Sequence, residues 1–254
     1  MEIQTLTDLS PSNLNFFPKM PTLFQALDGA APVGSLTVFA PTARTAELTA
    51  AVIPSKRHQG VFRALLNTAT RNLKGLGYQE LLFVCSSDNA EAQAVAAHWG
   101  LSLEHSEYLM DWSGDIPACP RALLSHAVRE EDISALSILC ADAFGETPEE
   151  SEHLFRQDLS TGRVFPLEKG LSACASCREG EGGLSIYGVV VPPSLRGQGW
   201  GKALMAALLK EISETFPGRP VVLEVSSTNL PALALYRSCG FTVRRRTDYY
   251  SQSL

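Results

Sequence analysis

The segment of this sequence with the clearest chemical content is a glycine-rich loop, Arg196-Gly197-Gln198-Gly199-Trp200-Gly201-Lys202, which opens an amphipathic helical pattern over 200–215. Backbone N–H groups that converge just before a helix bind anions, because the donors and the positive end of the helix dipole point to the same place. The glycines lack Cβ atoms, so the backbone can close around a diphosphate. Arg196 adds a cation that can donate two parallel hydrogen bonds to phosphate oxygens. The loop therefore predicts a diphosphate-binding site.

Two other nucleotide-binding loops do not fit this segment. The Rossmann fingerprint has a different glycine spacing and an acidic residue about 20 positions further on. The Walker A loop ends in Gly-Lys-Ser/Thr, whereas Gly201-Lys202-Ala203 lacks the hydroxyl group that binds magnesium. Tight helix packing is the alternative explanation of a lone Gly-x-Gly-x-Gly.

The loop has an earlier copy in the same chain. Residues 52–65 align with 191–204 at a constant offset of 139, and share Val, Pro, Ser, Arg, Gln, Gly, Ala and Leu. The Ser-Ser-x-Asn segments at 86–89 and 226–229 follow at an offset of 140, which Gly100 and Gly240 keep. Two matching blocks in the same order identify a tandem duplication. We expect two domains, 1–114 and 115–254.

Each half predicts the same order of elements. A first strand (45–52; 184–191) leads through the loop into a helix (61–76; 200–215) and a second strand (81–85; 221–225). A short helix that ends at a glycine and a final strand (103–112; 241–251) follow. A crossover of this length implies a parallel strand pair in an α/β sheet. Only the second half opens with a strand near 123–128 and helices at 129–144 and 147–159. The first half has an irregular stretch at 10–21, and 112–121 is the expected linker.

The C-terminal half resembles the GNAT superfamily of N-acetyltransferases. The family signature Q/R-x-x-G-x-G/A is met by Arg196, Gly199 and Gly201, and the element from Asn229 to Phe241 is similar to the family's downstream element, so that the match spans 184–241. The resemblance implies a mixed α/β sheet in two tandem GNAT domains and acetyl-CoA as the co-substrate, with no metal. The pantetheine arm would pair with the first strand, where a backbone N–H would polarise the thioester carbonyl. The implied cofactor-binding residues are Val189, Val190, Val191, Arg196, Gly197, Gln198, Gly199, Trp200, Gly201, Lys202, Asn229, Ala232 and Tyr236.

Two residues are candidates for proton transfer. Tyr236 matches the position of the family's usual general acid, and its alternative role is packing. Glu224 interrupts the apolar run at 221–225, where a carboxylate is costly unless it is paired, exposed or protonated. The spacing of Glu224 and Tyr236 is similar to that in ribosomal-protein N-terminal alanine acetyltransferases, which have a glutamate as the proposed base. A general base and an ion-pair partner both remain open for Glu224.

The first half has lost the residues that the resemblance implicates. Phe62 stands in the place of Gly201, Ala96 in that of Tyr236, and Val84 in that of Glu224. A benzyl group at Phe62 would obstruct the approach of a diphosphate. We therefore expect a non-catalytic N-terminal half, a layout similar to that of mycothiol synthases. Each half also ends in one final strand where a GNAT sheet has two, so we expect the halves to complete each other's sheets.

Composition excludes several classes of protein. A formal charge of −6 argues against sequence-independent nucleic-acid binding. No stretch approaches the roughly 18 apolar residues of a membrane span, and the N-terminus lacks the pattern of a signal peptide, so we expect a cytoplasmic protein. The six cysteines have no framework spacing; Cys174 and Cys177 form the one close pair, without the further ligands that a metal needs.

The expected reaction is direct attack of a primary amine on the thioester, without a covalent enzyme intermediate. An acyl-CoA-binding sensor without turnover is the main alternative, and a structural tandem domain is the third. The sequence does not distinguish among small amines, amino acids, antibiotics and protein N-termini as the acceptor. A homodimer is also left open. The acidic run at 146–152 could attract a cationic amine or form a solvated helix N-terminus.

Overall fold

The computed structural model describes residues 1–254 apart from 8–19, 158, 160 and 181–182. Apart from Met20 and Pro21, the irregular stretch expected at 10–21 lies outside the described residues. The chain divides into two compact units: the first contains Met1–Ser106 and Arg246–Leu254, and the second contains Glu107–Arg245. Each unit joins most of one sequence repeat to a piece of the other.

The elements follow the predicted order and add strands that the sequence pattern did not reveal. The first half contains β1 (Glu2–Leu6), β2 (Leu23–Asp28), β3 (Ala31–Phe39), β4 (Thr45–Val52), α1 (Val61–Gly75), β5 (Glu80–Ser86), α2 (Ala90–His98) and β6 (Ser102–Trp112). The second half contains β7 (His126–Ala127), α3 (Glu130–Phe144), α4 (Pro148–Gln157), β8 (Gly162–Pro166), β9 (Ser172–Gly180), β10 (Gly183–Val190), α5 (Trp200–Thr215), β11 (Val221–Ser226), α6 (Leu230–Ser238) and β12 (Phe241–Ser253).

The sheet of the first unit has the strand order β1-β2-β3-β4-β5-β12. Strands β4 and β5 are parallel, as predicted, with Thr45 opposite Glu80 and Leu48 opposite Phe83. Helix α1 is amphipathic because its buried side chains recur every three or four positions. These side chains pack with those of β2–β5 into one core, which includes Phe24, Leu36, Leu65, Leu73 and Leu81.

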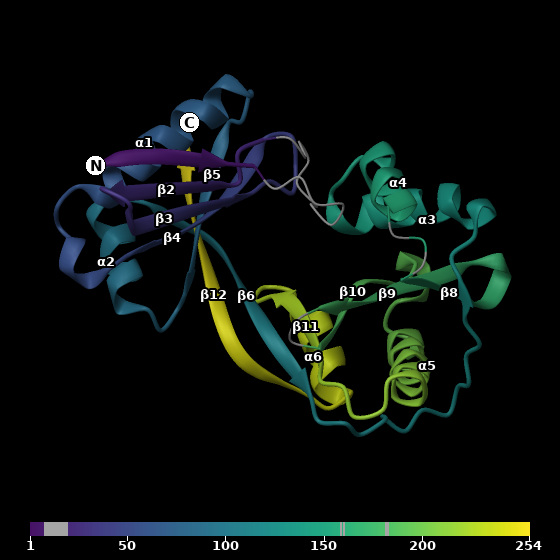
Figure 1. The fold of residues 1–254 in the computed structure, drawn as a ribbon. Coiled ribbons are helices and arrows are strands. Elements are labelled where there is room, and N and C mark those ends of the chain that lie inside the picture. Colours follow the sequence, from purple (N-terminus) through teal and green to yellow (C-terminus); the bar gives the residue numbers. More distant parts are fainter. Residues whose placement is uncertain (8–19, 158, 160, 181–182) are drawn as a thin grey trace. The chain divides into compact units, whose positions relative to one another are not determined.

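The second unit has the order β6-β11-β10-β9-β8-β7, with β10 and β11 parallel. Helix α5 lies on one face of strands β8–β10, and α3 and α4 lie on the opposite face (Figure 1). The α5 face holds the main core, built from α5, α6 and the sheet, with Phe165, Leu204, Leu208, Leu223 and Phe241 among its buried members. The α3 face holds a smaller cluster around Ile133, Leu136 and Val190.

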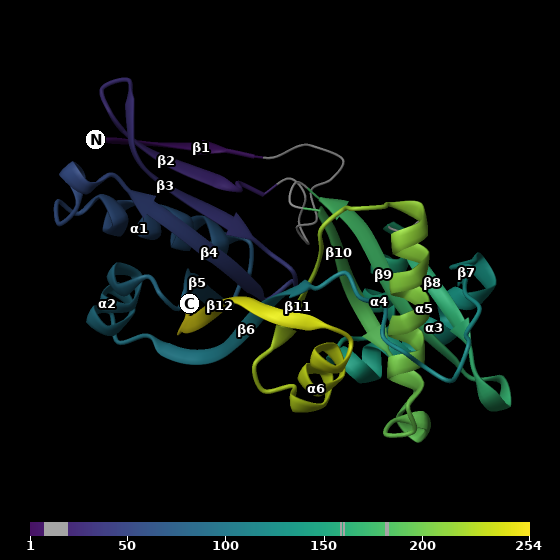
Figure 2. The same cartoon turned by 90° about the horizontal axis from the view of Figure 1, so that it is seen from below.

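The two repeats exchange their last strands. Residues Thr247 to Ser253 of β12 come from the second repeat and pair antiparallel with β5 of the first unit (Figure 2). Residues Glu107 to Asp111 of β6 come from the first repeat and pair antiparallel with β11 of the second unit. Each exchanged strand covers a sheet edge that would otherwise expose unpaired backbone groups. The expectation that the halves complete each other's sheets is confirmed.

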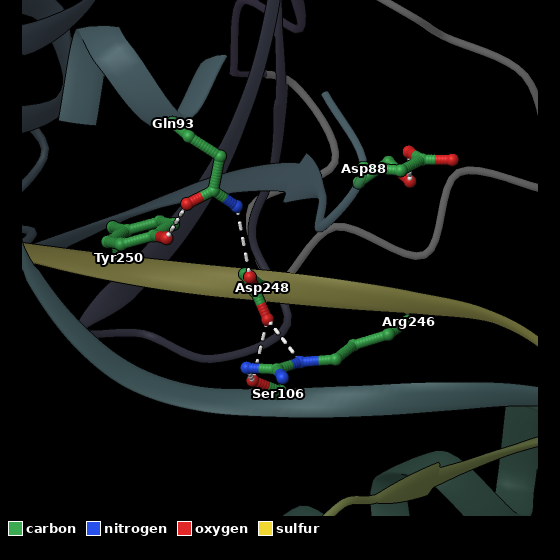
Figure 3. Close-up of polar contacts among 7 residues, drawn as sticks. Asp88, Gln93, Ser106, Arg246, Asp248 and Tyr250 are labelled. Carbon is green, nitrogen blue, oxygen red and sulfur yellow. Dashed lines mark hydrogen bonds and ion pairs between the residues drawn. The ribbon is translucent and has the colours of Figure 1, made fainter. Parts of the chain in front are cut away.

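A buried polar network fixes the exchanged end of β12 within the first unit (Figure 3). The carboxylate of Asp248 is only 4% exposed and accepts hydrogen bonds from Ser106 Oγ (2.7 Å), Gln93 Nε2 (3.1 Å) and Arg246 Nε (2.8 Å). The hydroxyl of Tyr250 donates to Gln93 Oε1 at 2.6 Å. Burial alone would raise the pKa of Asp248, but these donors hold it below its ordinary value.

Asp248→Ala is expected to lower the free energy of unfolding by about 2–3 kcal/mol, because it leaves buried donors without an acceptor. The folded pKa is depressed, so this stability is present above the unfolded pKa and is lost as pH falls through the folded value. Urea unfolding at neutral and acid pH measures both effects. Asp88→Ala is the matched control, since Asp88 lies on the exposed surface and accepts a hydrogen bond from nearby Ser86. Equal losses in the two variants would contradict a structural role for the network.

Candidate active site

The glycine-rich loop forms an open N-terminal end of α5. It leaves β10 through a short turn, Pro193–Leu195, and reaches the first residue of α5, Trp200. Gly197 and Gly199 have positive φ angles of 73° and 85°, and a Cβ added to either would meet no atom within 4 Å. The first turn of α5 carries no acidic residue. The loop therefore has both the backbone conformation and the free space that a diphosphate requires.

The flanking side chains shape the loop in different ways. Arg196 Nε donates to the carbonyl of Val191 at 3.0 Å, and Gln198 Nε2 donates to that of Ser194 at 2.9 Å, so both side chains brace the turn. A Cβ on Gly201 would lie 3.1 Å from Leu235 Cδ2, so this glycine permits α5 to approach α6 closely.

Trp200 and Lys202 complete the first turn of α5. Trp200 is buried, and its indole N–H finds no hydrogen-bond partner among the described residues. The guanidinium of Arg121 lies 4.1 Å from the Trp200 ring centroid. Lys202 is half-buried. Trp200 thus packs the base of the loop, and Lys202 adds positive charge to this end of α5, whereas Arg121 is paired with Glu168.

A β-bulge precedes the loop, and β10 stops pairing with its parallel neighbour at the same place. Tyr187 pairs with Ser176 and Val190 with Cys174, so β10 has one more residue than β9 over this span. Gly188 lies in the bulge with φ 61°. Pairing between β10 and β11 ends at Ile186 and Leu223, although both strands continue. Backbone groups near Val189 and Val190 are thereby left for another extended group, where the pantetheine arm was expected.

Gly188 is a residue that the sequence analysis missed. The repeat contains evidence of an inserted residue. Leu48 ends the pairing of β4 with β5 and Ile186 ends that of β10 with β11, so these two residues correspond, at an offset of 138. The offset has become 139 by Val52 and Val191. The extra residue forms the bulge. The strand sequences at 45–51 and 184–190 share too few identical residues for the insertion to be seen in the alignment.

Tyr236 lies on α6 with its ring packed edge-on against Phe241 at 6.0 Å between centroids. It is 8% exposed, and burial raises the pKa of its phenol to about 12. The phenol is therefore protonated at neutral pH and suited to donate a proton. Asn229 serves the same helix as its N-cap, because its side-chain oxygen accepts from the N–H of Ala232 at 3.2 Å.

Glu224 projects from the side of β11 opposite to its buried neighbours Leu223 and Val225, and is exposed. Partial burial, and next the nearby carboxylate of Glu107, raise the pKa of Glu224 above its ordinary value; Arg245 and Arg178 oppose the shift. Within the described part of the chain, no cation lies at ion-pair distance from Glu224. An exposed carboxylate with a raised pKa and no ion pair has the properties of a general base.

The corresponding loop of the first unit has the same backbone form. Arg57 Nε donates to Val52 at 3.1 Å, Gln59 Nε2 donates to Ser55 at 2.8 Å, and Gly60 has φ 82°. These contacts repeat those of Arg196, Gln198 and Gly199 in the second unit.

Three features distinguish the first unit from the second around this loop. Arg57 forms an ion pair with Glu91. Phe62 packs edge-on between Phe83 and Trp99. Strand β4 pairs with β3 in continuous register, from Phe39 and Glu47 to Gly34 and Val52, without a bulge. The first unit thus retains the loop, but its Arg57 is paired with Glu91 and its strand β4 has no bulge.

The acidic run of α4 is used within the protein. Thr147 N donates to Glu150 Oε2 at 2.8 Å, and Glu150 N donates to Thr147 Oγ1 at 3.2 Å, which forms a reciprocal helix cap. Glu152 pairs with Arg156 one helical turn further on. These contacts favour the helix N-terminus interpretation of the run.

Metal ligands, cysteines and membrane spans were the other features to consider among the described residues. No cluster of metal-ligating side chains occurs among the described residues. Cys174 is buried with its sulfur 3.6 Å from that of Cys140. Burial raises the pKa of the Cys177 thiol to about 11. In the described part of the chain, none of the helices combines the length and apolar character needed to span a membrane.

Comparison with known proteins defines the class. The model of the acetyltransferase (GNAT) family matches residues 5–101 and 132–241, once in each repeat. The chain therefore belongs to the GNAT acetyltransferase family and is an acyltransferase enzyme with two tandem GNAT regions.

Individual proteins similar to this chain include curated relatives and solved structures. The chain is 30% identical to a mycothiol acetyltransferase of Arthrobacter sp. over 78% of this chain and 67% of that protein. It is 27% identical to one of Saccharomonospora viridis, over 79% and 72%. Among solved structures, a GCN5-related N-acetyltransferase from Sphaerobacter thermophilus has a TM-score of 0.75 at 17% identity, covering 91% of this chain and 80% of that one. A tandem GNAT protein from the clavulanic acid biosynthesis pathway has a TM-score of 0.68 at 20% identity, covering 91% and 82%. The structural likenesses support the tandem fold.

Proposed function

We propose that this protein transfers an acetyl group from acetyl-CoA to a primary amine, with its active site in the C-terminal half. One observation carries the proposal: β10 bulges at Gly188 and parts from β11 immediately before an open diphosphate loop. The first half, taken as 1–114, has the loop without the bulge and is proposed to be non-catalytic. The active domain is then 115–254.

Acetyl-CoA fits the residues that are present. Its diphosphate would meet the N–H groups of the loop from Gly197 to Lys202 and the charge of Arg196. Its pantetheine amides would pair with the backbone of β10 near Val189 and Val191, which β11 leaves unpaired. Acetyl-CoA supplies the activated acetyl group, and direct attack by the amine needs no covalent carrier on the protein.

The proton transfers follow from the two side chains. Glu224 accepts a proton from the acceptor's ammonium group, either directly or through a bridging water. The free amine nitrogen then forms a bond to the carbonyl carbon of the thioester. A backbone N–H of the bulge stabilises the oxyanion. The carbon–sulfur bond then breaks, and Tyr236 donates its proton to the leaving thiolate. The products are an amide and the CoA thiol.

The kind of acceptor is suggested by the relatives. Proteins named mycothiol acetyltransferase are similar over most of this chain, which supports a small-molecule amine. The Glu224 and Tyr236 spacing alone also fits a peptide N-terminus, so a screen should contain both. Amine-dependent release of CoA thiol tests the proposal. Binding of acetyl-CoA without any amine-dependent release would favour a sensor instead.

Glu224→Gln is expected to lower kcat/KM by about 10²- to 10⁴-fold, because the amine loses its proton acceptor. The base must be deprotonated, so the wild-type rate should rise with pH through a pKa above the ordinary glutamate value. Glu107→Gln should move this rise to lower pH, since it removes a carboxylate that raises the pKa of Glu224. The pH profile of CoA release measures both. Glu179→Gln, which alters an exposed ion pair with Arg219, is the control. A wild-type rate in Glu224→Gln would eliminate Glu224 as the base.

A further inference from the structure

The sheet face that bears Glu224 also carries an arginine at the edge of the proposed acceptor site. Arg178 lies opposite Ser185 across β9 and β10, on the face away from the α5 core. Its guanidinium lies over the ring of Tyr187, 5.1 Å from the centroid. Arg178 is exposed, and within the described residues no carboxylate lies at ion-pair distance from it.

Tyr187 sits between this cation and Glu224. Ile186 and Leu223 are the last parallel partners, so the next residues, Tyr187 and Glu224, project side by side from the opposite face. The Tyr187 hydroxyl lies 2.6 Å from Thr161 Oγ1, which holds the ring in place. Arg178 is close enough to act on the pKa of Glu224. Because β10 lies between β9 and β11, the guanidinium and the carboxylate come from strands two spacings apart, roughly 10 Å along the sheet, which leaves room for a small molecule with a hydrogen bond at each end.

This arrangement presents opposite charges to one small molecule. An amine at Glu224 would place the rest of the acceptor over Tyr187 and within reach of Arg178. A guanidinium binds carboxylate or phosphate oxygens with parallel hydrogen bonds. A cation that has no ionic partner among the described residues and is stacked on a ring near the proposed base is suited to hold the acceptor's anionic group.

We infer that the acceptor is a zwitterionic small molecule, whose amine faces Glu224 and whose carboxylate, two to four bonds away, is bound by Arg178. The inference rests on the proposed acetyl transfer and gives its acceptor a chemical class. Arg178 is a positioning and specificity residue in this account and takes no part in proton transfer.

Matched acceptors test this inference. Glycine, β-alanine and 4-aminobutyrate are each compared with their carboxamides, which keep the amine and lose the negative charge. Wild-type kcat/KM should favour at least one amino acid over its amide by about 10- to 100-fold, the range expected for a charge-assisted contact. Arg178→Gln should abolish this preference by raising KM for the amino acid. Because the loss of Arg178 also raises the pKa of Glu224, the comparison is made on the high-pH plateau of each variant, where kcat and the amide rates should be unchanged. Arg219→Gln, an exposed arginine paired with Glu179, should retain the preference.

A binding measurement without turnover distinguishes failure of this inference from failure of the proposed acetyl transfer. β-Alanine and its amide are titrated calorimetrically into the protein in the presence of CoA. Acetylation of amines without charge preference, or equal losses for acids and amides in Arg178→Gln, would overturn the inference and leave the acetyltransferase proposal intact. Arg178-dependent binding of β-alanine without any turnover would support the inference and refute the catalytic proposal. Neither binding nor turnover would refute both.

Discussion

Tyr236→Phe is expected to lower kcat by about 10²- to 10⁴-fold and to leave the affinity for acetyl-CoA nearly unchanged. Phenylalanine keeps the buried ring and its edge-on contact with Phe241, so α6 should pack as before. The substitution removes one hydroxyl group. With a pKa of about 12, that hydroxyl is protonated throughout the neutral range and can supply the proton that the leaving thiolate needs.

Single-turnover release of CoA thiol measures the chemical step, and calorimetric titration measures cofactor affinity. Tyr78→Phe is the matched control, because Tyr78 is also buried with its pKa raised to about 12, but lies in the first unit. Its loss should leave kcat unchanged. If Tyr236→Phe turns over as fast as wild type, Tyr236 is a packing residue, and the proton must come from another donor.

Local features of the fold could be predicted because neighbouring residues encode them. Helix α5 spans Trp200–Thr215, as expected, since Gly199 precedes it and the apolar spacing runs through it. The parallel pairs followed from strand–helix–strand order alone. The network around Asp248 could not be predicted in this way. Its partners Gln93 and Ser106 lie more than 140 residues away in the sequence, and only the exchange of β12 brings them together.

The same distinction applies to the candidate site. The signature identified the loop, family resemblance identified Tyr236, and the break in the apolar run at 221–225 together with the resemblance identified Glu224. Their environments, and the bulge at Gly188, depend on strand register, which a motif does not contain. Arg178 had no signal in the sequence, because its relevance comes from its place over Tyr187 on the adjacent strand. Asn229 matches the family's downstream element, and in the structure its side chain caps the N-terminus of α6.

Gly199→Val is expected to weaken acetyl-CoA binding by at least about 100-fold. A side chain at this position would enter the open space in front of α5, where a diphosphate would lie, and its φ of 85° suits only glycine well. Gly218→Val is the matched control, because Gly218 has φ 74° and an equally open Cβ position in the turn after α5. Both variants incur similar backbone strain, so calorimetric titration of both separates strain from obstruction. Equal affinities would contradict binding at the loop.

Native mass spectrometry of the intact protein with acetyl-CoA tests the central claim most directly, because it counts cofactors per chain. The account predicts one acetyl-CoA per wild-type chain and none in Gly199→Val, with Gly218→Val retaining one. Two per chain would show that Phe62 and the paired Arg57 leave the first unit competent. No bound cofactor in the wild type would contradict the assignment of the loop as an acetyl-CoA site.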